Sequence, residues 1–530
     1  MQKLLIGLLL LACTMVAMAQ KRKLPPTISS WSNNEYAPKL TADGRSMLYM
    51  SDQTVSGGPE IFSSTAVGSS WSKGELMDIP HKNMIPFGAY NLSYDGQQLI
   101  YSSKKSPGIG GYDLRFQQKQ GGSWTQPVNP GKPLNSNLHE MDPTLSADGK
   151  TLYFSRCETL DPNGGNCKLF TAEFLGDVYW KEPQEIQLDL VSSSFVSPVI
   201  LPDNKTLYFA ALNSNGNYDM YMSRKEGTSW SKPIAMDFLN NDTHNRYIGV
   251  TALGDVAYIH EKGERSYDLY MVKVPEEFQP AKVYYLEGTV TNLPAKSLVS
   301  ATDAVTGEVL ARLVLDTEEK TFGIYLPEDH LVDFSVETKE SGFAYYSEFL
   351  DLTELKSSKK VVKDIALPTL RRGAQYPVDI TFKEHSADFG VGTETELNRL
   401  ITLMKQNRDY QFNIAVSQPS VTESEQYADS LPDIRYDTVL VKNQLDTHSG
   451  NDSINVEPDS AVVALAPAEE ILTIYHNNFT QKRAAAISAY FLEKGVPESM
   501  FSTTAEGKNV DFDYSESDKQ QNYKVVFYLE

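Results

Sequence analysis

Short apolar runs and polar turns alternate along the first half of the chain. The turns fall at residues 41–44, 93–96, 146–149 and 201–204, with a less regular copy at residues 251–255. Asp43, Asp95, Asp148 and Asp203 stand at the same place in the first four turns, at intervals of 52, 53 and 55 residues. Asp-Gly and Asp-Asn pairs tolerate the positive φ angles of a hairpin turn. A fixed period of this length predicts a repeat architecture built from hairpins.

Each repeat carries the pattern of four short strands. An apolar run precedes the turn, an aromatic-rich run follows it, and a third run often contains Tyr-Asp followed by an apolar residue. A fourth strand is expected at a tryptophan, which is Trp71, Trp124, Trp180 or Trp230 in the first four repeats. Four-stranded units repeated around an axis predict a β-propeller, here with five blades and with six as the alternative. The fifth repeat lacks its tryptophan strand, and we expect the segment at Trp31 to complete it and to close the ring from both ends of the domain.

The repeat also resembles a known family. The pattern Pro-x-Leu-Ser-x-Asp-Gly-x-x-Leu-Tyr-Phe-Ser, followed by Asp-Leu-Tyr, is similar to the WD40-like repeats of TolB-type propellers and covers residues 28–274. The resemblance implies a propeller that binds proteins, although related propellers also cover the active sites of peptidases. The repeated aspartates are interpreted as turn residues. A peptidase would need a Gly-x-Ser-x-Gly nucleophile elbow, which the sequence lacks, so we predict no enzyme and no catalytic residue.

A different module follows the linker at residues 275–280. Apolar strands at residues 284–290, 321–327 and 331–336, with turn residues at 303–308, predict a small β-sandwich. The order Gly-x-Val, Thr-Gly, Phe-x-Ile-x-Leu-Pro and Gly-Phe resembles the carboxypeptidase regulatory-like domain over residues 282–368. That resemblance implies a transthyretin-like sandwich that acts as a rigid connector.

The period changes again from residue 376. Strands are predicted at residues 378–382, 412–416 and 524–529, and helices at residues 394–407 and 481–494. Thr393 and Glu396 have the spacing of a capping box for the first helix, and Gly495 ends the second. Residues 376–530 therefore predict a small α/β domain.

The second helix resembles the OmpA-like family. Residues 476–484 are similar to its Asn-x-x-Leu-Ser-x-x-Arg-Ala signature, with Thr480 at the Ser position and Arg483 at the Arg position. In that family the arginine takes the carboxylate of the diaminopimelate side arm of peptidoglycan, which is sound guanidinium chemistry. Alternatively, Arg483 is a helix-surface residue beside a partner acid. His476 is not expected to bind a metal, because the eight histidines show no ligand spacing.

The rest of the OmpA-like pattern is incomplete. Residues 417–420 read Ser-Gln-Pro-Ser where the family has Gly-His-Thr-Asp, so the aspartate that would take the diaminopimelate ammonium is missing. An acidic, mostly aperiodic insertion at residues 421–470 predicts a flexible loop. The C-terminal domain therefore either associates with peptidoglycan or is a degenerate copy that contacts proteins only.

Composition and the N-terminus indicate the compartment. A net charge of −21 over 530 residues disfavours nucleic acid and anionic lipid as partners. Residues 1–19 read as a signal peptide cleaved after Ala19, while residues 10–13 resemble a lipobox that would instead lipidate Cys13. No later segment is apolar for long enough to span a bilayer. Cys157 and Cys167 flank a turn-rich loop, and in an oxidising compartment they are expected to form a disulfide.

The domain order as a whole resembles the periplasmic PorE-like proteins of the type IX secretion system in Bacteroidota. It implies a scaffold at the outer membrane, with protein partners for the propeller and peptidoglycan for the C-terminal domain. We expect no cofactor and no metal. The alternative is a protein-only adaptor in the same compartment.

Overall fold

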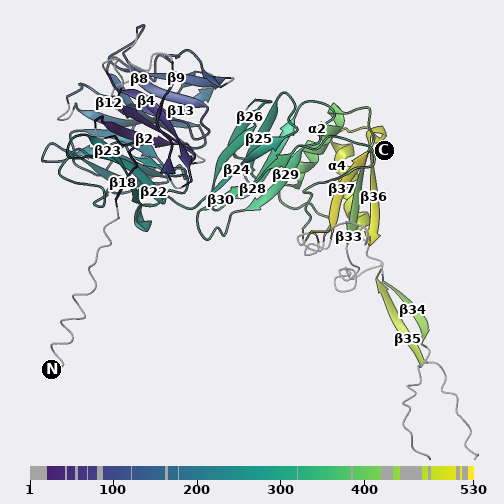
Figure 1. Ribbon diagram of the computed structural model, residues 1–530. Coiled ribbons are helices and arrows are strands. Elements are labelled where there is room, and N and C mark those ends of the chain that lie inside the picture. Colours follow the sequence, from purple (N-terminus) through teal and green to yellow (C-terminus); the bar gives the residue numbers. More distant parts are fainter. Residues whose placement is uncertain are drawn as a thin grey trace, which may run out of the picture. The chain divides into compact units, whose positions relative to one another are not determined.

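The computed structural model describes residues 21–30, 32–41, 44–53, 58–68, 70–79, 88–104, 106–120, 122–161, 165–176, 178–318, 320–383, 386–418, 434–441, 468–475, 479–508, 514–515, 518 and 523–529. The protein is mainly β and divides into two compact units (Figure 1). One unit holds the described part of Met1–Lys339 together with Glu348–Pro368, and the other holds Glu340–Ser347 and the described part of Thr369–Glu530. The predicted signal peptide, with Cys13, lies outside the described residues.

Within the described residues, the first unit begins with five antiparallel sheets, each made of strands that are consecutive in the chain except for one N-terminal addition. Sheet one contains β2 (Glu35–Leu40), β3 (Ser46–Ser51), β4 (Glu60–Val67), β5 (Ser70–Trp71) and β6 (Glu75–Leu76). Sheet two contains β7 (Tyr90–Leu92), β8 (Gln98–Ser103), β9 (Asp113–Gln120) and β10 (Ser123–Trp124). Sheet three contains β11 (His139–Leu145), β12 (Thr151–Cys157), β13 (Cys167–Gly176), β14 (Tyr179–Trp180) and β15 (Gln184–Glu185). Sheet four contains β16 (Phe195–Ile200), β17 (Thr206–Leu212), β18 (Tyr218–Glu226), β19 (Ser229–Trp230) and β20 (Ile234–Ala235). Sheet five contains β21 (Gly249–Val250), β22 (Val256–Lys262), β23 (Tyr267–Lys273) and β1 (Arg22–Lys23).

These sheets form a closed ring. Neighbouring sheets pack on each other, and β2 of the first sheet contacts all three of β21, β22 and β23 in the fifth. The second strands are buried on both faces, as with Leu99, Ile100 and Tyr101, because a sheet lies on either side of them. A ring of four-stranded antiparallel sheets is the architecture of a β-propeller, as the repeats predict.

The strand that completes the fifth sheet comes from the N-terminal side but is not the one expected. It is β1, which pairs with β23 in the register Arg22↔Met271 and Lys23↔Tyr270. Trp31 lies outside the described residues. Both residues of β1 are exposed, so no apolar run marks this strand in the sequence. Its place is set by backbone pairing and by the ion pair between Lys23 Nζ and Asp268 (2.7 Å).

The five hairpin turns share one geometry. Their fourth residues have positive φ, in the order Gly44 (67°), Gly96 (71°), Gly149 (70°), Asn204 (54°) and Gly254 (74°). The backbone N–H of each donates to the carbonyl three residues earlier. In the second, third and fourth turns the aspartate accepts hydrogen bonds from its own turn, as at Asp148, whose Oδ1 accepts from Ser146 Oγ and from the Lys150 backbone N–H. Asp43 lies outside the described residues. Their role as turn residues therefore follows from local hydrogen bonds.

A two-sheet sandwich completes the first unit after the 3₁₀ turn η2 (Glu276–Phe278). One sheet contains β24 (Val283–Thr291), β27 (Thr321–Pro327), β30 (Lys359–Val362) and β31 (Ile365–Ala366). The other contains β25 (Ser297–Asp303), β26 (Val309–Leu315), β28 (Leu331–Thr338) and β29 (Tyr346–Asp351). The rings of Phe322 and Phe334, 5.7 Å apart, pack between the two sheets.

The second unit is a small α/β domain. Its sheet has the order β32 (Gln375–Pro377), β37 (Lys524–Leu529), β33 (Phe412–Gln418) and β36 (Phe501–Lys508). The helices are α2 (Thr393–Gln406) and α4 (Phe479–Glu493), and a 3₁₀ turn, η3 (Glu498–Met500), precedes β36. Helix α4 ends at Gly495 (φ 73°), with bonds from Gly495 N to Leu492 O and from Val496 N to Phe491 O, as in a Schellman motif.

The structure corrects three expectations in this domain. Residues 378–382 are not a strand: the N–H groups of Asp379, Thr381 and Phe382 donate to the side chains of Glu396, Thr393 and Tyr523 instead of to a neighbouring strand. The capping box is also wrong. The N-cap is Gly392 in a left-handed conformation, because the hydroxyl of Thr393 donates to the Thr381 carbonyl and the carboxylate of Glu396 accepts from Tyr345 and Ser347.

The third correction concerns the insertion at residues 421–470, for which the mostly aperiodic sequence predicts a flexible loop. It contains strand β34 (Ile434–Val441), which pairs with β35 (Ala468–Tyr475) from Ile434↔Tyr475 to Val441↔Ala468 (Figure 1). The acidic composition of the whole segment obscures two runs that are rich in β-branched and aromatic residues. The remaining residues of the insertion lie outside the described part of the chain.

Candidate functional site

Each of the five hairpin turns contacts the sandwich or the linker that leads to it. The contacts join Arg45 to Glu287 (3.4 Å), the Tyr94 ring to the Tyr325 ring (5.0 Å between centroids), Lys150 Nζ to the Val309 carbonyl (2.7 Å), the Ala281 N–H to Asp203 Oδ2 (2.8 Å), and Gly254 to Pro280. A Cβ on Gly254 would lie only 2.2 Å from the Pro280 ring, so that contact requires glycine. We call this side of the ring the turn face.

The opposite side of the ring is formed by the connections between the second and third strands of each sheet. In the two C-terminal sheets these are residues 213–217 and 263–266. Because strands of this length separate the two ends of each hairpin, these connections lie away from the turns that the sandwich covers. We call this side the loop face.

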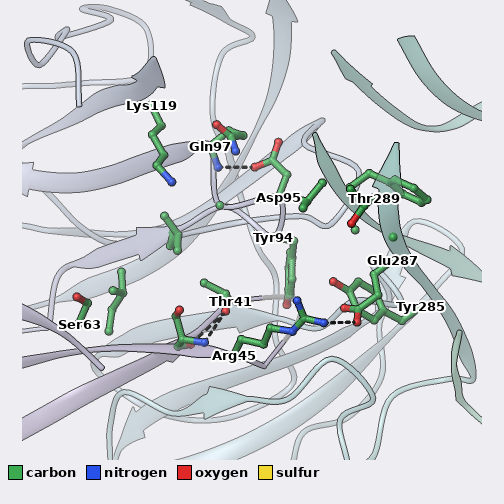
Figure 2. A pocket seen from close by; sticks show the side chains of 18 of the residues that line it. Thr41, Arg45, Ser63, Tyr94, Asp95, Gln97, Lys119, Tyr285, Glu287 and Thr289 are labelled. Carbon is green, nitrogen blue, oxygen red and sulfur yellow. Dashed lines mark hydrogen bonds and ion pairs between the residues drawn. The ribbon is translucent and has the colours of Figure 1, made fainter. Parts of the chain in front are cut away.

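A pocket of about 480 Å³ lies where the turn face meets the sandwich (Figure 2). Lys119, Gln97 and Asp95 lie along one side of it, and Thr41 and Arg45 lie along another. Tyr285, Glu287 and Thr289 of β24 form the sandwich wall. Trp124 of β10 adds an aromatic surface.

The charges that line this pocket are largely satisfied by one another. Glu287, buried with its side chain only 6% exposed, pairs with Arg45 and with Lys360 (Oε2–Nζ 3.1 Å). Asp95 accepts from Ser93 Oγ and from the Gln97 N–H within its own turn (Figure 2). The Tyr94 hydroxyl donates to the Ile200 carbonyl (3.0 Å), and burial raises the pKa of Tyr94. Of these bonds, the Arg45–Glu287 pair joins the sandwich to the turn face, and the others lie within the propeller or within the sandwich. The pocket is therefore a consequence of that docking.

A second group of polar side chains gathers where the innermost strands meet. Four residues at equivalent places in sheets one, three, four and five have positive φ: Ala37 (50°), Asp142 (50°), Ser197 (53°) and Tyr247 (57°). In the first three the strand register shifts at that point, which marks a β-bulge. Bulges re-aim side chains, and non-glycine residues with this backbone gather at functional sites.

Arg246 is the centre of this group. Its Nη2 lies 3.0 Å from Asp142 Oδ2, and its Nε donates to Ser197 Oγ (3.1 Å). The guanidinium carbon lies 5.0 Å from the centre of the Tyr218 ring and 4.6 Å from that of Tyr247, within cation–π distance of both. The side chain is still 24% exposed. The arrangement holds one cation rigidly and leaves part of it open to solvent.

Two further titratable groups lie near Arg246. Burial lowers the pKa of Lys39 to about 8, although the charge of Asp142 acts to raise it. Burial and the charge of Arg246 together lower the pKa of His260 to about 3. At pH 7 this region therefore holds two cations, Lys39 and Arg246, and a neutral His260.

Arg483, the predicted peptidoglycan ligand, is not a surface residue. It is 1% exposed, and its guanidinium carbon lies within 5.3 Å of the rings of Phe382, Phe479 and Tyr523. Its Nε donates to the Ser386 carbonyl (3.1 Å). The expectation of a helix-surface residue is therefore wrong, because three aromatic rings enclose the charge. Thr480, its companion in the motif, is 0% exposed.

Other predicted positions are placed more simply. Cys157 and Cys167 are joined by a disulfide that links the ends of β12 and β13 in sheet three. His476 lies outside the described residues. No group of three His, Cys, Asp or Glu side chains within the described ranges is arranged to hold a metal ion. In the same ranges no helix has the length and apolar character needed to cross a bilayer.

No single motif in the sequence marks the group around Arg246. Lys39, Asp142, Ser197 and Arg246 come from four separate segments of the chain. Three of them lie next to a proline that opens a repeat: Lys39 follows such a proline, and Asp142 and Ser197 each precede one. That sign becomes informative once the ring brings the segments together.

Comparisons with known proteins find no matching family model and no matching curated protein. Solved structures with some likeness include a putative TolB from Agrobacterium tumefaciens, which is 14% identical over 55% of this chain and 90% of its own, with a TM-score of 0.29. TolB from Acinetobacter baumannii is 14% identical over 46% of this chain and 55% of its own, with a TM-score of 0.30. An oligogalacturonate lyase from Vibrio parahaemolyticus is 10% identical over 50% of this chain and 96% of its own, with a TM-score of 0.30. Likeness at this level carries no argument about function, and the assignment of a propeller rests on the sheet topology.

Proposed function

We propose that this protein is a non-enzymatic scaffold of the cell envelope whose propeller binds a protein partner through its loop face. One observation carries the proposal: all five hairpin turns contact the sandwich or its linker, so the turn face is already occupied. The loop face is the side of the ring that remains for a partner. A ring fastened in this way presents the loop face as a rigid surface, which lowers the entropic cost of binding.

The finer parts of the proposal follow the sequence resemblances. The five sheets are taken as the complete set of blades, the sandwich as a carboxypeptidase regulatory-like connector, and the second unit as an OmpA-like domain. With a cleaved signal peptide, or with Cys13 lipidated, the protein belongs in the periplasm near the outer membrane. There it would serve as an accessory of a type IX-like secretion system.

For the C-terminal domain we favour a protein-contact role over peptidoglycan binding. A guanidinium that is 1% exposed and enclosed by Phe382, Phe479 and Tyr523 has to be uncovered before it can take a diaminopimelate carboxylate. The aspartate expected for the ammonium is also missing from residues 417–420. Both facts support the adaptor, whereas the motif residues Arg483 and Thr480 support the peptidoglycan reading.

Site-specific photocrosslinking tests the loop-face proposal. Benzoylphenylalanine is placed at Asn215 or Glu264 on the loop face, and at the exposed Ile234 of β20 or Val314 of β26 as matched controls. The full chain is then irradiated with a solubilised envelope fraction of the source organism. We expect one crosslinked species from both loop-face positions and from neither control. The same species at equal yield from all four positions would refute the proposal.

Sedimentation with purified peptidoglycan separates the two roles of the C-terminal domain. We expect the full chain to stay in the supernatant. If the wild type pellets and Arg483→Lys does not, the guanidinium is a ligand and the adaptor role is wrong. Arg483→Lys keeps the charge but removes the bidentate geometry, so it tests recognition and not simple attraction.

A further inference from the structure

A buried acceptor without a partner lies beside Arg246. Asp142 is 4% exposed, and its Oδ2 accepts from the Ser197 N–H (2.9 Å), from Ser197 Oγ and from Arg246, whereas its Oδ1 has no hydrogen-bond partner among the described residues. Lys39 is 8% exposed, and the charge of Asp142 acts on it. Buried polar groups in folded proteins are almost always paired. The unpaired Oδ1 therefore indicates that a donor from outside the chain completes it.

The charge of this place indicates what kind of group that is. Asp142 is the one carboxylate that acts on Lys39 and is also the one that pairs with Arg246 within the described residues. Two cations and one anion leave a net positive charge, within a chain whose overall charge is −21. The Nε and Nη2 atoms of Arg246 are used by Ser197 and Asp142, and its Nη1 makes no hydrogen bond to any described residue. A free guanidinium edge, with a second cation beside the same carboxylate, is suited to an oxyanion, above all a carboxylate.

Arg246 lies toward the end of the ring that the proposed partner would use. It precedes β21, and the turn at the far end of β21 is the one that contacts Pro280 on the turn face. His244, two residues before Arg246, is exposed, and its Nδ1 accepts from the Tyr218 N–H (3.3 Å). Within the fifth sheet, Arg246 is therefore on the side of β21 away from the turn face.

We propose that the group formed by Lys39, Asp142, Ser197 and Arg246 is a carboxylate-binding site for a peptide segment of the partner. The carboxylate bonds to the free edge of Arg246, where the positive charge of Lys39 adds to the attraction, and a neighbouring peptide N–H donates to Asp142 Oδ1. A peptide supplies both the acceptor and the donor that the site lacks. The carboxylate comes from an acidic side chain or from a chain terminus. This inference rests on the proposed function, because it names the chemistry by which the loop face takes its partner.

Saturation-transfer NMR on the full chain, with millimolar capped tripeptides, tests the proposal. The probes are acetyl-Gly-Glu-Gly-amide, its neutral glutamine counterpart, and acetyl-triglycine with a free terminus. We expect binding of a carboxylate peptide and at least fivefold weaker binding of the glutamine peptide. The stronger of the two carboxylate peptides identifies the source as a side chain or a terminus. Equal binding of all three peptides, or binding of none, overturns the proposal.

Two variants of Arg246 guard against misfolding. Arg246→Gln removes the cation, and we expect it to weaken binding of the carboxylate peptide at least fivefold and to abolish its advantage over the glutamine peptide. Arg246→Lys keeps the positive charge, and we expect it to restore part of that advantage. A disrupted fold cannot restore a preference for the carboxylate. If Arg246→Gln still prefers the carboxylate peptide fivefold, the proposal is wrong.

The crosslinking experiment tells failure of this inference from failure of the proposed function. If Asn215 and Glu264 crosslink to the partner equally well in the wild type and in Arg246→Gln, the scaffold role stands and the carboxylate site does not. If neither position crosslinks in the wild type, the scaffold role itself fails.

Discussion

Two glutamates at equivalent places in the propeller are predicted to respond to the same substitution in opposite ways. Glu35 of β2 is 1% exposed and accepts from the N–H and hydroxyl of Ser30. Burial raises its pKa from 4.5 to about 7, with smaller contributions from the charges of Asp268 and Asp52, against the lowering effect of the Ser30 bonds. Glu140 of β11 has the same two bonds, from Ser136, but it also pairs with Arg156 (2.8 Å).

The sign for Glu35 follows from its raised pKa. Between pH 4.5 and about 7 the folded protein binds the Glu35 proton more tightly than the unfolded chain does. The free energy of unfolding therefore falls as the pH rises through that window, by up to about 3 kcal/mol at 1.36 kcal/mol per pKa unit. Glu35→Gln keeps the acceptor for Ser30 and removes the buried charge. We expect it to stabilise the propeller at pH 8 by about 1–3 kcal/mol and to have little effect at pH 4.5.

Glu140→Gln is the matched control. It preserves the bonds from Ser136 but leaves the guanidinium of Arg156, which is 14% exposed, without its carboxylate. Breaking a buried pair in this way costs about 3–5 kcal/mol, and that cost persists at pH 8.

Urea unfolding followed by tryptophan fluorescence measures both effects on the propeller alone, because all five tryptophans lie between Trp31 and Trp230. The curves are recorded at pH 4.5, 6 and 8 for the wild type and both variants. If Glu35→Gln destabilises the propeller at pH 8 as much as Glu140→Gln does, the reasoning from burial is wrong.

Three further predictions concern single contacts. Replacing Cys157 and Cys167 with serine removes a disulfide between residues ten apart in the sequence, so the unfolded chain gains conformational entropy. We expect the free energy of unfolding of the propeller, measured in urea, to fall by about 2–3 kcal/mol. An unchanged midpoint would contradict this reasoning. Arg483→Ala leaves a cavity among three aromatic rings, and we expect it to lower the free energy of unfolding of the C-terminal domain by about 2–4 kcal/mol. Unfolding is followed by circular dichroism at 222 nm. An unchanged free energy of unfolding would mean that the packing of the rings around Arg483 does not stabilise the domain. Tyr94→Ala removes the ring contact with Tyr325, so the linker at residues 275–282 should open more often and trypsin should cleave it several-fold faster. Equal cleavage rates in the variant and the wild type would mean that the contacts of the other four turns are sufficient to hold the sandwich.

The sequence alone determined the elements that depend on local chemistry. Asp-Gly pairs at a fixed period specified the hairpin turns, because positive φ and an aspartate cap are properties of four residues. Three strands of the sandwich, at residues 284–290, 321–327 and 331–336, and both helices of the C-terminal domain were predicted to within a few residues, because their apolar positions follow one period. The spacing of Cys157 and Cys167 likewise pointed to a bond that joins two adjacent strands.

Tertiary structure decided whatever depends on residues far apart in the chain. The strand that completes the ring, Arg22–Lys23, has no apolar signal, because only its backbone pairs with β23. Residues 378–382 alternate like a strand, but their N–H groups found side-chain acceptors on other segments. The motif around Arg483 indicated either a peptidoglycan ligand or a helix-surface residue beside a partner acid, yet rings from three segments enclose this side chain. The group at Arg246 exists only because closure of the ring brings four of its sheets to one place, and no local pattern encodes that closure.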